Sequence, residues 1–153
     1  MDLILWRHAE AIDADDGSED LGRALTARGE RQAARMAHWL NQHLPATTRV
    51  LVSPARRCQQ TAAALERKFK TVADLGTGAT VPGLLAVVRW PDAKEPVLVV
   101  GHQPTLGLTA AYLLAGVAQP WSVKKGAVWW LRRRDRIGDD ETVLVTVRGP
   151  ENV

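Results

Sequence analysis

Residues 3–10 read Leu3-Ile4-Leu5-Trp6-Arg7-His8-Ala9-Glu10, which is four apolar residues followed at once by an arginine, a histidine, an alanine and a glutamate. An apolar run without alternation is typical of a strand that is buried on both faces of a parallel sheet. Ligands of open α/β sheets bind outside the carboxyl ends of the strands. In an α/β domain, Arg7 and His8 would therefore lie where a binding site is expected.

The chain then repeats this order of strand, loop and helix. Apolar segments at 49–52 and 96–101 predict two further buried strands. Apolar residues at helical spacing predict helices over about 27–43, from Pro54 to about Lys70, and from Pro104 to about Ala115. Thr26 is the expected N-cap of the first helix and Ser53 that of the second.

The last part of the chain changes character. Strand-like segments at 127–133 and 142–148 flank a polar segment with Gly138, which predicts an antiparallel hairpin at a sheet edge. Residues 71–96 are expected to hold a short strand near 71–75 and one helical turn at 84–88. The pattern predicts a three-layer α/β/α fold whose central sheet is mostly parallel. We find no linker, repeat or low-complexity segment, which favours a single domain over residues 1–153.

Composition narrows the function classes. Hydrophobic residues make up 46% and charged residues 24% of the chain, which is typical of globular proteins. No apolar run approaches the length of a membrane span, and Cys58 is the only cysteine, so we expect a cytoplasmic protein without membrane association. The net charge of +3 comes from scattered basic residues, which fits an anionic ligand and gives no support to nucleic-acid binding. The basic runs at 124–125 and 132–134, and the acidic loop at 12–24, are interpreted as solvated.

Each predicted strand is followed by residues whose side chains can bind phosphate. The first supplies Arg7 and His8, the second supplies Arg56 and Arg57 near a helix N-terminus, and the third supplies His102. Helix N-termini favour anions, and guanidinium groups match phosphoryl oxygens as planar forks. Adjacent arginines on a helix cannot point the same way, so one of Arg56 and Arg57 is expected to face water. Each residue alone would more often be structural, but together they predict a phosphoryl site.

Four separated segments resemble motifs of the histidine phosphatase superfamily, whose fold is phosphoglycerate mutase-like. They follow in the family's order across residues 3 to about 115. The short chain and the histidine-x-proline pattern at 102–104 are most similar to the SixA-type phosphohistidine phosphatases. The matching segments are Arg7-His8-Ala9-Glu10, Leu25-Thr26-Ala27-Arg28-Gly29 with Gln32-Ala33, residues 53–62, and Gly101-His102.

The resemblance implies a role for each candidate residue. His8 would be the nucleophile that becomes transiently phosphorylated, while Arg7, Arg57 and His102 would surround the phosphoryl group. The resemblance selects Arg57 over Arg56, because the family's arginine lies four residues after the serine. It further implies an enzyme that uses no metal and no cofactor and that hydrolyses phosphohistidine on a protein, such as a phosphorelay or phosphotransfer carrier.

Two other functions remain open on this sequence. One is a phosphatase or mutase of the same superfamily that acts on small-molecule phosphate monoesters. The other is a non-catalytic module that binds phosphoproteins. A carboxylic acid within reach of the leaving group would favour the first. A phosphatase assay with a chromogenic ester would distinguish the second, a non-catalytic module, from an enzyme.

Two positions depart from the family pattern. Ala9 stands where the family usually has glycine. Gly83 lies near the place where many members have a carboxylic acid that protonates the leaving oxygen, and Asp74 and Asp92 are the nearest carboxylates. SixA-type members are similar in lacking a clear acid there. Imidazole leaving from phosphohistidine can carry its own proton and needs less acid catalysis than an alkoxide, so this departure favours phosphohistidine as substrate.

Overall fold

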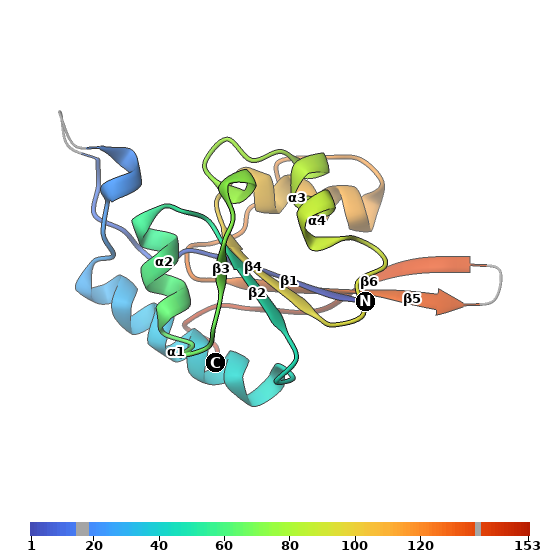
Figure 1. The fold of residues 1–153 in the computed structure, drawn as a ribbon, viewed down its shortest axis with the longest axis horizontal. Helices are drawn as coiled ribbons and strands as arrows, with labels where there is room; N and C mark the ends of the chain where they lie inside the picture. Colours follow the sequence, from blue (N-terminus) through green and yellow to red (C-terminus); the bar gives the residue numbers. More distant parts are fainter. Residues whose placement is uncertain (15–18, 137–138) are drawn as a thin grey trace.

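A mixed sheet lies between two layers of helices in the computed structural model, which describes residues 1–14, 19–136 and 139–153 (Figure 1). The strands are β1 (Asp2–Arg7), β2 (Arg49–Val52), β3 (Lys70–Thr71), β4 (Val97–Gly101), β5 (Val128–Arg136) and β6 (Asp139–Arg148). The helices are α1 (Ala27–His43), α2 (Arg56–Ala63), α3 (Val81–Val88) and α4 (Thr105–Ala115), with 3-10 turns η1 (Asp20–Gly22) and η2 (Ala73–Leu75).

The strand order is β3-β2-β4-β1-β5-β6. Strands β3, β2, β4 and β1 pair in parallel, whereas β5 pairs antiparallel with β1 and β6 antiparallel with β5. The register places Arg7, the last residue of β1, opposite Gly101, the last residue of β4. The predicted α/β/α fold with a mostly parallel sheet and an antiparallel edge hairpin is therefore confirmed.

Alternate residues of β1 enter two separate cores. Ile4 and Trp6 pack with residues of α1 and α2, while Leu3 and Leu5 pack with residues of α3 and α4 on the opposite face. All four side chains are fully buried. Each contributes about 1.5–3 kcal/mol relative to an exposed position. Because helices cover both faces (Figure 1), the sequence of this strand is uniformly apolar.

Helix α1 follows its predicted bounds. The Thr26 side chain accepts a hydrogen bond from Gly29 N at 2.9 Å and so caps the first turn. The predicted apolar stripe, with Met36 and Leu40 at its centre, is buried against the sheet. The amphipathic pattern was therefore sufficient to place this helix.

Helix α2 is shorter than predicted at both ends. Ser53 does not cap it, because the Ser53 hydroxyl hydrogen-bonds His102 and the helix begins at Arg56, after Ala55. The helix ends at Ala63 rather than near Lys70. Three residues further on, Glu66 adopts a left-handed backbone with φ of 55°, so the chain cannot continue as a helix.

Residues 71–96 also differ from the prediction. In place of the predicted strand near 71–75, the chain has the two residues of β3, then Val72, and then η2. Helix α3 has two turns instead of one, because the Thr80 side chain accepts a hydrogen bond from Gly83 N and Pro82 occupies the first turn. The glycines and prolines around Thr80 are typical of loops, so the sequence does not predict this cap.

The edge hairpin is anchored to β1 by an ion pair. Arg132 donates to the two oxygens of Asp2 at 2.7 and 2.9 Å, so this residue of the basic run is ion-paired, while 42% of its side chain stays exposed as expected for a solvated residue. The indole of Trp130 donates to the same carboxylate at 3.0 Å. In the described part of the chain, every helix is too short or too polar to cross a membrane.

Candidate active site

The carboxyl ends of β1, β2 and β4 meet at one edge of the sheet. His8 N donates to Gly101 O at 3.2 Å, and Ser53 N donates to Val100 O at 3.0 Å. These backbone bonds continue the ladders one residue past each strand. They bring the side chains of His8 and His102 together with Ser53, which was expected only as a helix cap.

The ring of His8 is held in one tautomer. Its Nδ1 lies 2.8 Å from Ala9 O, and a carbonyl can only accept, so Nδ1 carries the proton and Nε2 keeps its lone pair. Burial lowers the pKa of His8 to about 3, and the positive charges of Arg57 and Arg7 act in the same direction, against the hydrogen bond to Ala9. At neutral pH, His8 is therefore an uncharged imidazole with a free nitrogen lone pair.

His102 lies opposite His8, with 5.4 Å between the ring centroids. Its Nε2 is 2.7 Å from Ser53 Oγ, and its Nδ1 is 3.4 Å from Arg57 Nη2. Burial, followed by the charge of Arg57, lowers the pKa of His102 to about 4. Arg57 Nη2 can only donate, so His102 Nδ1 accepts, and the neutral ring carries its proton on Nε2, which donates to Ser53 Oγ.

Arg57, and not Arg56, joins this group. The Arg57 side chain is almost fully buried and donates to Asp20 O at 2.8 Å and to Asp20 Oδ2 at 3.2 Å. Arg56 is exposed and lines a separate hollow with residues of the 12–24 loop. The arginine selected by the family resemblance is therefore the one that the fold turns towards His102.

Arg7 completes the arrangement from the end of β1. Its Nη1 donates to Val123 O at 2.9 Å. The Nε atoms of Arg7 and Arg57 are buried, and the described residues provide no hydrogen-bond partner for either atom. Both guanidiniums keep donor capacity that the protein itself does not use, which suits them to bind an anion.

All four predicted residues line one cavity of about 210 Å³. No carboxylate is among the described residues that line it, and its wall carries four basic side chains. Its lining is Arg7, His8, Ala11, Arg23, Arg57, Thr77, His102, Gln103 and Lys125. The cavity is therefore strongly positive and fits an anionic group.

Lys125 is a lining residue that the sequence analysis missed. It precedes Gly126, whose φ of 75° favours glycine and whose N–H is 3.1 Å from Arg7 O and 3.0 Å from His8 O. This turn holds Lys125 beside the end of β1. The predicted hairpin did not show which strand it pairs with, and only the antiparallel pairing of β5 with β1 places the residues before β5 near the carboxyl end of β1.

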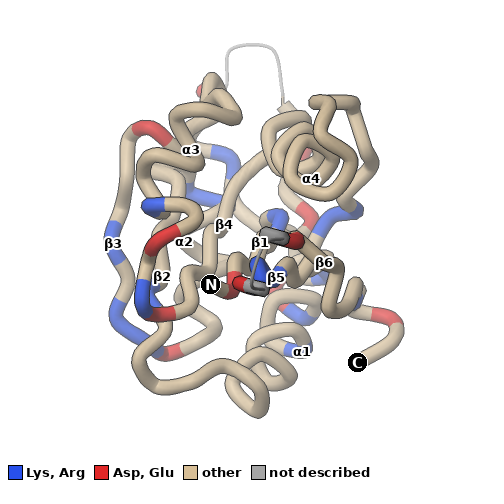
Figure 2. Tube along the Cα trace, turned by 90° about the vertical axis from the view of Figure 1, so that its right-hand side faces the viewer, with Lys and Arg blue, Asp and Glu red and all other residues tan. Residues whose placement is uncertain are grey.

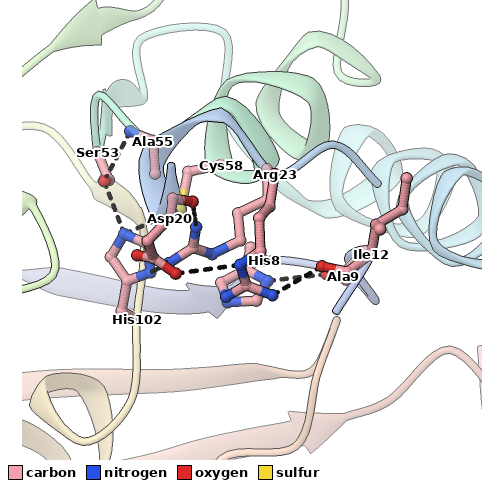
Figure 3. Close-up of polar contacts among 10 residues, drawn as sticks. His8, Ala9, Ile12, Asp20, Arg23, Ser53, Ala55, Cys58 and His102 are labelled. Carbon is pink, nitrogen blue, oxygen red and sulfur yellow. Dashed lines mark hydrogen bonds and ion pairs between the residues drawn. The ribbon is translucent and has the colours of Figure 1, made fainter. Parts of the chain in front are cut away.

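Asp20 is a second residue that the sequence analysis missed, because the acidic loop was interpreted as solvated. Its carboxylate accepts from Arg57 and, at 3.0 Å, from Arg23 Nε, so it lies between two cavity arginines (Figure 3). Burial acts to raise the pKa of Asp20, but the charge of Arg57 and the hydrogen bonds from Arg23 and Arg57 outweigh it and keep the pKa below its usual value. Asp20 is therefore ionised and is a poor proton donor. Residues 15–18 of this loop lie outside the described residues.

The two departures from the family pattern have structural answers. Ala9 is fully buried and donates its N–H to Thr61 Oγ1 at 3.1 Å, and its φ is not in the left-handed range, so alanine fits without strain. Asp74 and Asp92 do not line the cavity, and Asp92 lies at a different hollow beside Arg89 and Lys94. Neither carboxylate occupies the place of a leaving-group acid.

Cys58 packs beneath His102. Burial raises the pKa of its thiol to about 12, which agrees with its interpretation as a packed thiol and not a nucleophile. Across residues 1–14, 19–136 and 139–153, no group of three or more His, Cys, Asp and Glu side chains is arranged to hold a metal ion.

Known proteins are similar to this chain in both sequence and fold. The model of the histidine phosphatase superfamily (branch 1) matches residues 3–76. The phosphohistidine phosphatase SixA of Escherichia coli K12 is 31% identical over 129 residues, which cover 78% of each chain. A candidate SixA from Nakamurella multipartitia has 32% identity and a TM-score of 0.80 over 97% of this chain and 95% of its own. The protein histidine phosphatase SixA solved with tungstate has 28% identity and a TM-score of 0.77 over 99% of each chain.

Proposed function

The chain belongs to the histidine phosphatase superfamily, and we propose that it hydrolyses phosphohistidine on proteins through a phosphorylated His8. The observation that carries this proposal is the geometry of His8. Its Nδ1 is fixed on Ala9 O, and its free Nε2 belongs to an uncharged ring in a cavity lined by Arg7 and Arg57. A buried neutral imidazole surrounded by guanidiniums is suited to attack a phosphorus atom.

The proposed reaction has two displacements. In the first, His8 Nε2 forms a bond to phosphorus while the bond from phosphorus to the substrate imidazole breaks and that imidazole leaves. In the second, water attacks the phosphorus of phospho-His8, which releases inorganic phosphate and restores the neutral ring. Arg7, Arg57 and His102 would surround the phosphoryl group, and the two guanidiniums would stabilise charge on the peripheral oxygens, where such transfers gain most of their acceleration.

The preference for phosphohistidine rests on the lining of the cavity. No described lining residue is a carboxylate, and Asp20, the carboxylate beside it, is ion-paired to Arg23 and Arg57. An ester would have to release an alkoxide without a positioned acid, whereas imidazole can leave with its own proton. General acid catalysis contributes about 10²–10⁴-fold, so its absence disfavours esters by that order.

A trapping experiment tests the intermediate. Brief incubation with labelled phosphohistidine protein should leave phosphate on His8 that is stable in alkali and lost in acid, as expected for a phosphoramidate. EDTA should leave this labelling unchanged, because the guanidiniums supply the positive charge. Label that persists in His8→Ala, or that requires a divalent ion, would disprove the mechanism.

A substrate panel tests the specificity. We expect kcat/KM for a phosphohistidine protein to exceed that for phosphoglycerate or a sugar phosphate by at least about 10²-fold. Steady-state rates for these substrates provide the measurement, and p-nitrophenyl phosphate reports activity without a specific leaving group. Similar rates on a phosphate monoester metabolite would favour the alternative of a small-molecule phosphatase.

A further inference from the structure

One face of α1 carries three exposed arginines beside a second hollow. Arg28, Arg31 and Arg35, here called the arginine face, lie three to four residues apart and so share one side of the helix. They line a hollow of about 310 Å³ together with Gln32, Pro150 and Glu151.

The arginine face is largely unpaired. Arg28 Nη1 lies 4.0 Å from Glu10 Oε1, the outer limit for an ion pair. Arg31 and Arg35 make no hydrogen bond or ion pair with any described residue. Unpaired exposed guanidiniums on one face are available to an acidic surface of another molecule.

This face adjoins the catalytic cavity. Gln32 Oε1 accepts from Glu10 N at 3.0 Å, two residues after His8. A Cβ on Gly126 would lie 3.7 Å from Gln32 Cβ, and the residue before Gly126 is Lys125, which lines the catalytic cavity. The first turns of α1 lie at the end of the sheet where β1 ends (Figure 1), and basic positions are coloured along this helix in Figure 2.

The size of the catalytic cavity places most of a substrate outside it. Its volume of about 210 Å³ is below the roughly 300–1,000 Å³ of sites that enclose a whole small molecule. A phosphoryl group and its imidazole would occupy it, while the protein that carries them would lie on the surrounding surface. The arginine face is part of that surface and is positive.

We propose that the arginine face of α1 is the docking surface for an acidic patch on the phosphorylated protein. This inference rests on the proposed function, because it requires a protein substrate at the His8 cavity. Charged side chains at the rim of an interface act mainly on the rate of association and on its salt dependence. The surface is therefore expected to affect kcat/KM for a protein substrate and not the chemistry.

The test compares two triple variants on three substrates. Arg28→Gln/Arg31→Gln/Arg35→Gln removes the arginine face. Lys68→Gln/Lys70→Gln/Lys94→Gln removes three exposed charges near the amino ends of β3 and β4, none of which lines the catalytic cavity or the hollow beside the arginine face. The probes are a histidine-phosphorylated phosphotransfer domain of net negative charge, free phosphohistidine, and p-nitrophenyl phosphate.

We expect the arginine triple to lower kcat/KM for the phosphorylated domain about tenfold at low salt, since three modest ion pairs together have this effect. Its rates on both small substrates should equal those of the wild type, and the difference should shrink as salt rises. The lysine triple should match the wild type throughout.

Three results would overturn the docking surface: an unchanged rate of the arginine triple on the phosphorylated domain, an equal loss in the lysine triple, or an equal loss on free phosphohistidine. A wild type that hydrolyses free phosphohistidine but not the phosphorylated domain would instead remove the protein substrate from the proposed function, and the docking surface with it.

Discussion

Arg57 and Arg56 are neighbours in the chain with opposite environments. Arg57 is buried beside His102, whereas Arg56 is exposed on the outer side of α2. A guanidinium that touches the transferring group stabilises the charge that develops in the transition state, while an exposed one contributes little.

We therefore expect Arg57→Ala to lower kcat/KM by about 10²-fold or more and Arg56→Ala to change it less than about twofold. The measurement is the initial rate on free phosphohistidine, with circular dichroism to show that both variants are folded. A large loss in Arg56→Ala would mean that the register of α2 is different in solution.

At the residue scale, the sequence predicts the site residues that follow strands and misses the one that lies in a loop. Arg7, His8 and His102 follow apolar strands directly, so their convergence could be predicted. Asp20 reaches Arg57 across 37 positions in the chain, and no local periodicity encodes that contact. The choice of Arg57 depended on the family resemblance, because the spacing of residues does not show which of two adjacent arginines on a helix faces the strand ends.

At the scale of elements, the contact between α1 and the loop after His8 is unusually close. Gly29 lies in the first turn of α1, and a Cβ there would collide with the backbone oxygen of Glu10. Thr26 N also donates to that oxygen at 3.0 Å. The helix can approach the catalytic loop only because residue 29 has no side chain.

Gly29→Ala should lower the free energy of unfolding by about 1–3 kcal/mol, because the overpacking exceeds the gain of about 1 kcal/mol in helix propensity. It should also reduce activity, since Glu10 is two residues from His8. Gly78→Ala is the matched control, as a Cβ there meets nothing within 4 Å. Urea unfolding of both variants provides the measurement, and an equally stable Gly29→Ala would refute the close contact.

The sequence predicts best those elements that have a local cap or a periodic apolar pattern. Helix α1 has both a cap and an apolar stripe, and its bounds were predicted. The start of α2 was misplaced because Ser53 bonds His102, a residue 49 positions away, instead of capping its own helix. Tertiary contacts of this kind override a capping preference of about 1 kcal/mol.

At the scale of the whole molecule, the buried neutral histidines make stability depend on pH. Burial holds the pKa of His8 near 3 and that of His102 near 4, whereas an unfolded histidine has a pKa of 6.5. Between these values the unfolded chain binds protons that the folded chain does not. The stability they contribute is therefore complete above pH 6.5 and is lost as the pH falls below it.

We expect the free energy of unfolding to fall as the pH decreases from 6.5 to 4.5, by up to about 1.4 kcal/mol per pH unit for each histidine. Chemical denaturation at a series of pH values provides the measurement. His8→Asn should remove one histidine's share of the slope, and the range from pH 7 to 8 should be flat in both proteins. A wild-type slope of zero below pH 6.5 would contradict the burial of neutral rings.

In the proposed reaction, the pairing of Asp20 with Arg57 would make binding of the phosphoryl group an exchange of anions at Nη1 and Nη2. Because the guanidinium already holds a carboxylate and a carbonyl, an incoming anion gains only the difference between its own interaction and theirs. A singly charged anion such as chloride or acetate gains little binding free energy from this exchange. A phosphoryl group with two charges and three oxygens, which would also meet Arg7, gains much more, so competition with Asp20 would favour the binding of dianions over that of monoanions.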